Sequence, residues 1–145
     1  MRPMRPERSH EEWIAELRLR LRYIHRDIIG TTGGSPGVRD ETALESALSA
    51  AFATFGGQDL FPDPISKAGA LLRSICLHHP FFDGNKRAAW VLAREFLLEH
   101  AITRDPDLAQ SAIEEFMLAV AAGEVEIEKI IEWLREHTRT EDDPQ

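Results

Sequence analysis

The chain has one cysteine, no long apolar run and a shortage of positive charge. A single cysteine among 145 residues excludes an internal disulfide bond. No apolar run approaches the roughly 18 residues of a membrane-spanning helix, and the start shows no signal-peptide pattern, so we expect a cytoplasmic protein without membrane contact. The net charge of −8 comes without any basic stripe, which argues against nucleic acid as a direct partner.

Internal repeats and the two-residue apolar alternation of strands are also missing. Apolar residues instead recur at spacings of three and four almost throughout, which is typical of one face of a helix. A length of 145 residues suits one domain with its own core. We therefore expect an all-α fold, a compact single-domain bundle of about six helices over residues 9–138. Residues 1–8 are expected to form a disordered leader and 139–145 an acidic tail.

Capping residues, alone or before a proline, predict where helices begin. They are Ser9 with Glu12 for the first helix, Asp40 for the second, Asp63-Pro64 for the third and Asp105-Pro106 for the fifth. Gly123 is expected to end the fifth helix. The glycine-rich stretch 30–37 predicts a loop, and 56–62 an irregular segment. The loop lacks the Gly-x-x-x-x-Gly-Lys spacing of a phosphate-binding loop, and no strand precedes it.

The stretch from His79 to Arg87 reads His-Pro-Phe-Phe-Asp-Gly-Asn-Lys-Arg and joins two expected helices. We expect His79 at the end of the first, on its inward side, because Pro80 stops that helix. The second helix begins at Asn85, where unpartnered amides and the helix dipole favour an anion. Lys86 and Arg87 add cations at this same end, where they are normally unfavourable. Such a local conflict indicates function rather than stability.

The residue types in this stretch suit the binding and transfer of a phosphate. Gly84 lets the backbone approach a ligand closely. Arg87 offers a fork for two phosphate oxygens, and Lys86 supplies a point charge on a flexible stem. Asp83 is a hard oxygen ligand suited to Mg²⁺ that also binds substrate phosphates. His79 can accept a hydroxyl proton near neutral pH.

Structural explanations compete with these roles. A histidine on an apolar helix face is commonly a hydrogen-bonded core residue, and an aspartate before a helix is commonly only its cap. Phe81 and Phe82 are expected in the core whatever the function. A structural metal at His78, His79 and Asp83 is a weaker alternative, since no second cluster supplies ligands at the usual spacings. The ordered combination between two helices favours the functional interpretation.

The stretch resembles the signature of the Fic/Doc superfamily, His-x-Phe-x-(Asp/Glu)-(Gly/Ala)-Asn followed by Lys-Arg or Gly-Arg. The resemblance implies that His79 deprotonates a target hydroxyl, that Asp83 holds Mg²⁺, and that amides behind Gly84 cradle an anion. It implies ATP as the substrate. The nucleotide-binding residues by position are Phe81, Gly84, Asn85, Lys86 and Arg87.

With lysine at position 86, the motif resembles that of the death-on-curing (Doc) branch, whose members are the toxin half of a bacterial type II toxin–antitoxin pair. Most Fic proteins have glycine there and transfer AMP. In the Doc branch the lysine fills that space and ATP binds turned around, so that the γ-phosphoryl group faces the histidine. The resemblance thus implies a protein kinase that blocks translation, with a threonine of elongation factor Tu as the family's target. The alternatives are a Fic-type protein AMP-transferase and a catalytically silent helical module that binds a protein.

Further positions bear on these alternatives. Trp90 stands where Fic AMP-transferases carry another arginine, whereas Gly84 is the Fic-like residue. The Fic inhibitory signature, Ser/Thr-x-x-x-Glu before Gly or Asn, is absent, so restraint by a separate antitoxin protein is implied. In Fic-type proteins the segment corresponding to 56–63 is a flap that pairs with the target backbone. The alternative is that Phe61 fills the core and the glycines close a turn.

Overall fold

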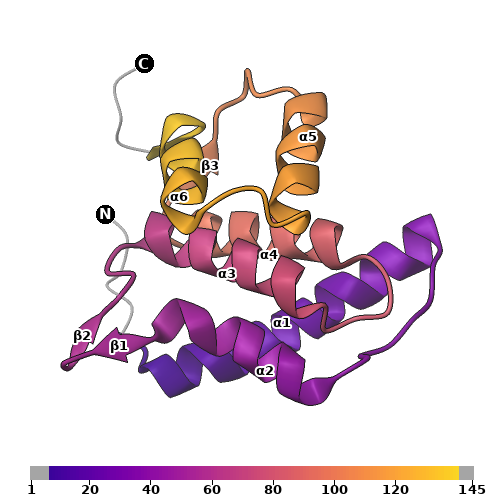
Figure 1. The fold of residues 1–145 in the computed structure, drawn as a ribbon, viewed down its shortest axis with the longest axis horizontal. Coiled ribbons are helices and arrows are strands. Elements are labelled where there is room, and N and C mark those ends of the chain that lie inside the picture. Colours follow the sequence, from indigo (N-terminus) through magenta and orange to yellow (C-terminus); the bar gives the residue numbers. More distant parts are fainter. Residues whose placement is uncertain (1–6, 141–145) are drawn as a thin grey trace.

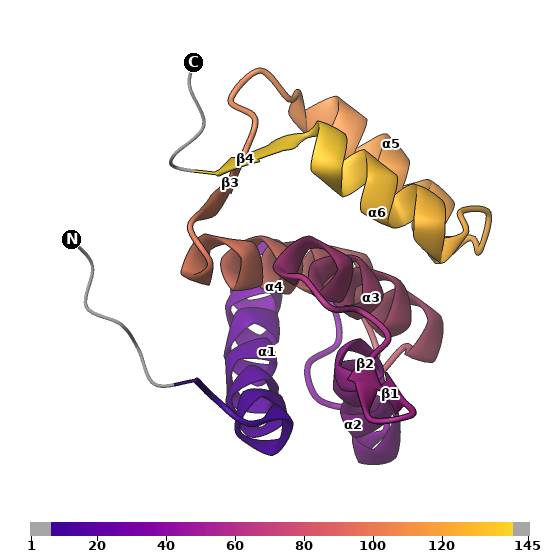
Figure 2. The same cartoon turned by 90° about the vertical axis from the view of Figure 1, so that its left-hand side faces the viewer.

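A computed structural model describes residues 7–140 and shows helices stacked in three layers (Figures 1 and 2). In the lower layer lie α1 (His10–Thr32) and α2 (Glu41–Ser49), followed by a 3-10 turn, η1 (Ala50–Phe52). The middle layer holds α3 (Pro64–His78) and α4 (Asn85–Glu99), and the upper layer α5 (Gln110–Ala121) and α6 (Ile127–Glu136). The all-α class and the six helices predicted from the sequence are confirmed over the described residues.

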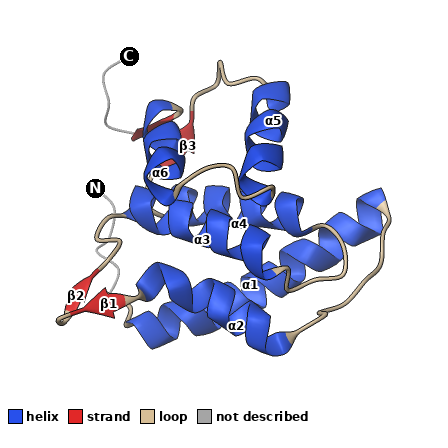
Figure 3. Cartoon of the chain, in the orientation of Figure 1, coloured by secondary structure: helices blue, strands red, loops and turns tan. Residues whose placement is uncertain are grey.

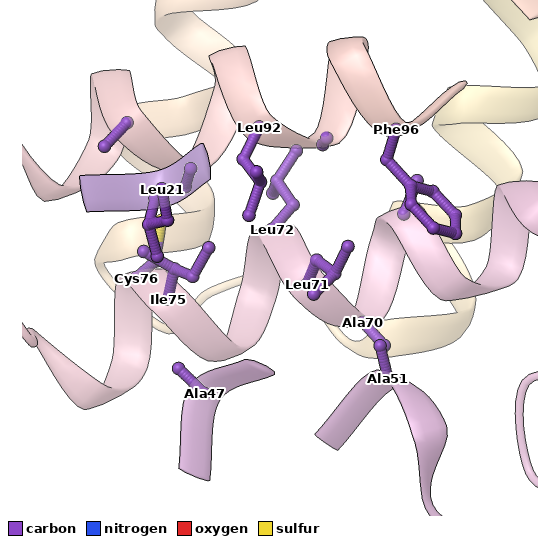
Figure 4. Close-up of a cluster of buried hydrophobic side chains, with 14 of the residues drawn as sticks. Leu21, Ala47, Ala51, Ala70, Leu71, Leu72, Ile75, Cys76, Leu92 and Phe96 are labelled. Carbon is purple, nitrogen blue, oxygen red and sulfur yellow. The ribbon is translucent and has the colours of Figure 1, made fainter. Parts of the chain in front are cut away.

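The middle layer is the centre of the hydrophobic core, since it is covered on both faces. Leu71, Leu72 and Ile75 of α3 are completely buried (Figure 4). Leu92 and Phe96 of α4 are buried beside them. Cys76, the cysteine of the chain, also lies in this core. The α3–α4 pair is therefore the rigid support for the turn that joins the two helices.

Two short antiparallel strand pairs, which the sequence analysis did not predict, flank the helices (Figure 3). One is a hairpin of β1 (Thr54–Phe55) and β2 (Gln58–Asp59), and the other pairs β3 (Ile102–Arg104) with β4 (Thr138–Thr140). Strands of two or three residues are too short to show an alternating pattern. Residues 56–62 are therefore not simply irregular: Gly56 and Gly57, with φ of 59° and 79°, supply the two positive φ angles of a tight hairpin turn.

Most predicted helix starts are confirmed. Ser9 and Glu12 form a complete capping box, and the carboxylates of Asp40 and Asp63 accept hydrogen bonds from the first turns of α2 and α3. Gly123, with φ of 75°, follows the end of α5 as expected.

The predicted start of the fifth helix at Asp105-Pro106 is wrong, because α5 begins at Gln110. The backbone N–H of Asp105 donates to the carbonyl oxygen of His137, which extends the β3–β4 pairing. The Asp105 carboxylate then accepts a hydrogen bond from the N–H of Asp107 in a turn, so it caps no helix. Similar signals can therefore mark a turn or a helix start.

Other boundaries also differ from the expectations. Helix α1 continues through Gly30 to Thr32, where the Thr31 and Thr32 hydroxyls donate back to the carbonyl oxygens of Asp27 and Ile28. Of the expected leader, Arg8 lies within the structure and pairs with Glu99, whereas residues 1–6 lie outside the described residues. Of the expected tail, residues 139–140 belong to β4, and 141–145 lie outside the described residues. Among residues 7–140, no helix combines the length and apolarity needed to cross a bilayer.

Candidate functional site

His79 ends α3 in a left-handed conformation, with φ of 47° and ψ of 58°. This conformation is uncommon for residues other than glycine, and strained residues of this kind cluster at functional sites. The His79 side chain is exposed, so its expected inward orientation is wrong. The physical reason is that the left-handed residue turns the chain out of the helix, and the helical period no longer sets where the side chain lies.

Arg39, just before α2, fixes the end of α3 from outside. Its Nε donates to the carbonyl oxygen of His79 at 2.7 Å, and its Nη2 donates to that of His78 at 3.0 Å. The backbone N–H of Arg39 donates to the carbonyl oxygen of Pro80 at 2.7 Å. A helix C-terminus leaves carbonyl groups without partners inside the helix, and Arg39 satisfies them here.

The two phenylalanines of the turn lie in different surroundings. Phe81 is 1% exposed and stacks on the ring of His25 in α1, with centroids 3.8 Å apart and planes 5° from parallel. Phe82 is 57% exposed, so its expected burial is wrong. The Phe81 side chain lies in the core and anchors the turn.

Asn85 closes the turn with its side chain. Its Oδ1 accepts a hydrogen bond from the N–H of Phe81 at 3.0 Å, and its Nδ2 donates to the carbonyl oxygen of Phe81 at 3.0 Å. Gly84, with φ of 78°, is the N-cap of α4 and provides no side-chain cap. The first amides of α4 therefore face the site without a capping side chain, in the arrangement that binds anions.

Asp83 is held by hydrogen bonds at its backbone carbonyl group and at its side-chain carboxylate. Its carbonyl oxygen lies 2.8 Å from Nε2 of the buried His25, and because a carbonyl only accepts, this nitrogen carries the proton. Its carboxylate Oδ2 accepts a hydrogen bond from the N–H of Ser35 at 2.7 Å. A Cβ on Gly34 would lie 3.3 Å from the Cβ of Asp83. Residues 33–37 thus form a loop, as expected, and they also support Asp83, whereas residues 30–32 of the expected loop belong to α1.

The contributions of His25, Ser35 and Arg39 were missed by the sequence analysis. His25 gave a signal, because it is a polar residue next to the apolar stripe of α1 that includes Leu21 and Ile28. Ser35 acts through its backbone N–H, which any residue but proline has, and Arg39 acts on backbone carbonyl oxygens. Neither leaves a recognisable side-chain pattern.

A pocket of about 590 Å³ opens where α1 ends, α4 begins and α5 passes. These parts of the three helices lie at the right in Figure 1. Lys86 and Arg87 line it with exposed side chains, and within residues 7–140 neither forms an ion pair. His79 and Phe81 do not line the pocket. The predicted site residues that do are Asp83, Gly84, Asn85, Lys86 and Arg87.

Neither thiol chemistry at the buried cysteine nor the structural metal considered above finds support. Burial raises the pKa of Cys76 to about 11, although the nearby charge of Lys86 lowers it, so the thiol stays protonated and unreactive near neutral pH. Among residues 7–140 no three His, Cys, Asp or Glu side chains are grouped to hold a metal ion, which removes the structural metal at His78, His79 and Asp83. A single carboxylate at Asp83 still fits Mg²⁺, because that ion takes its other ligands from phosphates and water.

Comparison with known proteins places these features in context. The model of the Fic/DOC family matches residues 18–97. The protein named toxin Doc from Mycolicibacterium smegmatis (strain ATCC 700084 / mc(2)155) is 34% identical over 113 residues, which cover 74% of this chain and 87% of that protein. The family match includes the α3–α4 turn and both segments that brace it, but ends before α5.

Proposed function

This chain belongs to the Fic/DOC family, and on that premise we propose that it is a Doc-like toxin that transfers the γ-phosphoryl group of ATP to a hydroxyl of a target protein. Members of the family are enzymes that transfer nucleotide or phosphate groups to proteins. The observation that carries the proposal is the open N-terminus of α4. It combines uncapped amides with the cations of Lys86 and Arg87, which have no ion-pair partner among residues 7–140, on the turn that carries His79.

In the proposed reaction the α4 amides and the two cations hold the phosphates. Arg87 can grip two phosphate oxygens, while Lys86 contributes a point charge. The His79 imidazole takes the proton of the target hydroxyl, whose oxygen bonds to the γ-phosphorus as the bond to the β–γ bridging oxygen breaks and ADP leaves. The exposed His79 side chain has no hydrogen bond to other described residues, so it is available to the target.

Asp83 is the residue that would hold Mg²⁺. Its Oδ2 accepts the hydrogen bond from Ser35, and Oδ1 has no such bond within residues 7–140. When bound, the ion would neutralise charge on the phosphates. The bonds from His25 and Ser35 fix the carboxylate beside the pocket before a ligand arrives, which is the preorganisation that phosphoryl transfer requires.

Asn85 has a different proposed role from the phosphate ligand implied by the family resemblance. Both ends of its side-chain amide are engaged with Phe81, which leaves one Nδ2 hydrogen for a phosphate. We assign Asn85 chiefly to holding the turn.

Transfer of AMP is the second candidate. Gly84, the Fic-like residue, supports it, because it leaves room beside the first amides of α4. Lys86 and Trp90 oppose it, because both line the pocket at positions where AMP-transferases have glycine and arginine. We therefore favour the kinase.

The exposed side chains of the β1–β2 hairpin suit it to dock the target protein. Phe55 is 81% exposed and Leu60 is also exposed, just before the helix that ends at His79. Phe61 packs partly against the core, and its carbonyl oxygen accepts a hydrogen bond from Lys67. The segment thus has an anchored end and an apolar free end.

A threonine of elongation factor Tu in the cytoplasm is the proposed target, and a separate antitoxin protein is proposed to restrain the activity.

The decisive experiment uses ATP labelled separately at its α- and γ-phosphates. The protein is incubated with a cell lysate and each ATP, with the His79→Ala variant as the control. Transfer of the γ label alone supports the kinase, and transfer of the α label supports AMP transfer. Transfer of neither label would overturn both enzymatic proposals and favour a silent binding module.

A further inference from the structure

The pocket changes character along α4, from cationic to aromatic. Its cationic end is the start of the helix, with Lys86 and Arg87. Trp90 lines the same pocket one helical turn further on, four residues after Lys86 and three after Arg87. Residues three and four apart are neighbours on one helix face. The indole therefore adjoins the anion-binding end.

The Trp90 ring is held from behind by the upper layer. It meets the ring of Trp133 in α6 edge to face, with centroids 6.2 Å apart and planes at 77°. Trp133 is in turn stacked on Phe116 of α5, at 3.9 Å and 3°. Trp133 does not line the pocket. Trp90 is thus a half-buried aromatic side chain that both packs against the upper layer and lines the pocket.

The wall of the pocket that α5 forms is apolar with an acidic group. Ile113, Met117 and Leu118 of α5 line it, and Leu118 is 59% exposed. Glu114 lies on the same wall. A carboxylate repels phosphates but can accept hydrogen bonds from sugar hydroxyls. A ligand with phosphates at one end and a flat apolar ring at the other would therefore lie with its phosphates at α4.

We propose that Trp90 is the stacking platform for the base of the nucleotide, which binds between α4 and α5 with its phosphates on Lys86 and Arg87. This inference rests on the proposed nucleotide-dependent transfer. A volume of about 590 Å³ falls within the range of small-molecule sites, roughly 300–1,000 Å³. Stacking accepts any base, because every base has a π-face, so Trp90 contributes affinity and orientation rather than selection among bases.

The test compares binding of ATP with binding of inorganic tripolyphosphate, which has the charge but lacks the base. Calorimetric titrations are made on the wild type, Trp90→Ala, Trp90→Phe and the control Trp133→Phe. Trp90→Ala should weaken ATP binding about 10-fold or more, in the range of base–aromatic stacking, and leave tripolyphosphate binding unchanged. Trp90→Phe should retain most of the ATP affinity, because phenylalanine keeps a ring.

Tryptophan fluorescence gives a second readout that needs only the conservative variants. ATP, but not tripolyphosphate, should quench the fluorescence of the wild type. That quenching should be lost in Trp90→Phe and persist in Trp133→Phe.

Four results would overturn the inference. Unchanged ATP affinity in Trp90→Ala would show that the base lies elsewhere, as would equal losses for ATP and tripolyphosphate. Wild-type protein that binds tripolyphosphate as tightly as ATP would leave the phosphate site standing but remove the base platform. Wild-type protein that binds neither would sink the proposed function together with this inference.

Discussion

His78 and His79 are adjacent and both exposed, yet only His78 is tied to its own helix. Nδ1 of His78 lies 2.8 Å from the carbonyl oxygen of Ser74, whereas the His79 side chain makes no hydrogen bond among residues 7–140. His79→Ala should lower the initial rate of phosphate transfer by about 10²–10⁴-fold, the usual loss for a general base. The matched control, His78→Ala, should remain near wild-type activity. A fully active His79→Ala variant would remove His79 as the base.

Asn85 and Lys86 are also neighbours, but only Asn85 is expected to contribute to the stability of the fold. Asn85→Ala removes both side-chain hydrogen bonds to Phe81, each worth about 0.5–1.5 kcal/mol. The free energy of unfolding in urea should therefore fall by about 1–3 kcal/mol. Lys86→Ala removes an exposed side chain without an ion pair among the described residues, so stability should change by less than about 0.5 kcal/mol. Equal stability of the two variants would contradict the role of Asn85 in closing the turn.

The sequence could predict those site residues that lie close to one another along the chain. Asp83 to Arg87 are contiguous, and a helix start brings them together without help from the rest of the fold. His25 is 58 residues from its partner Asp83, and Ser35 is 48 residues away. A local pattern carries no information on such contacts. The predicted inward orientation of His79 was wrong, because a residue in the left-handed conformation does not follow the period of the helix before it.

At the scale of elements, the loop before α2 acts as a backbone support for the α3–α4 turn. A Cβ on Gly34 would lie 3.2 Å from Cδ1 of Ile29 and 3.3 Å from Cβ of Asp83, whereas a Cβ on Gly37 would meet nothing within 4 Å. Both glycines have positive φ, 111° and 96°, so substitution strains either backbone. The contacts with Ile29 and Asp83 distinguish Gly34 from Gly37. Gly34→Ala should reduce transfer activity more than Gly37→Ala, at protein concentrations corrected for folded fraction, and similar losses would contradict the supporting role.

The β1–β2 hairpin is the element proposed to dock the target. Phe55→Ser and Leu60→Asp should each raise the apparent KM for the protein target while leaving the affinity for ATP unchanged, because both side chains are exposed and neither lines the pocket. Leu19→Ser, at an apolar residue of α1 whose exposure lies between those of Phe55 and Leu60, is the control. If target modification by the two hairpin variants matches the wild type, the hairpin is only a connector.

The helices were predictable where a cap and a helical period agreed. Asp63 before Pro64 and the apolar spacing that follows gave α3 its correct start. Asp105 before Pro106 gave an equally good signal but begins a turn, since the neighbouring strand β3 pairs with β4 at the far end of the sequence. The hairpin was missed because its strands have two residues each, although the Gly56-Gly57 pair is a recognised hairpin signal.

At the scale of the whole molecule, Glu99 near the end of α4 is held by Arg8 and by Arg20 of α1, at 2.7 and 3.2 Å. Burial alone would raise the pKa of Glu99, but the hydrogen bonds from the two arginines outweigh it and hold this pKa below the usual 4.5. The unfolded chain therefore takes up a proton at a higher pH than the folded one. This stabilisation is present at neutral pH and is lost as the pH falls below about 4.5.

Glu99→Gln should consequently lower Tm at neutral pH, and the difference from the wild type should narrow in acid. Some acid sensitivity should remain, because Arg135 and backbone N–H groups also lower the pKa of Asp63 in spite of its burial. Glu128→Gln, at an exposed position of α6, is the control. Thermal unfolding across the acid range checks this, and a Tm difference that does not depend on pH would contradict the assignment.

The bonds that fix Asp83 also set an order of events in folding. The helices on either side of the turn can form from local contacts within microseconds, whereas contacts distant in sequence must wait for loop closure. Because His25 and Ser35 lie 58 and 48 residues before Asp83, the turn acquires its final shape only when the lower layer has docked. A chain that is already helical but still collapsing would lack a competent turn, so the fold delays the appearance of activity until folding is complete.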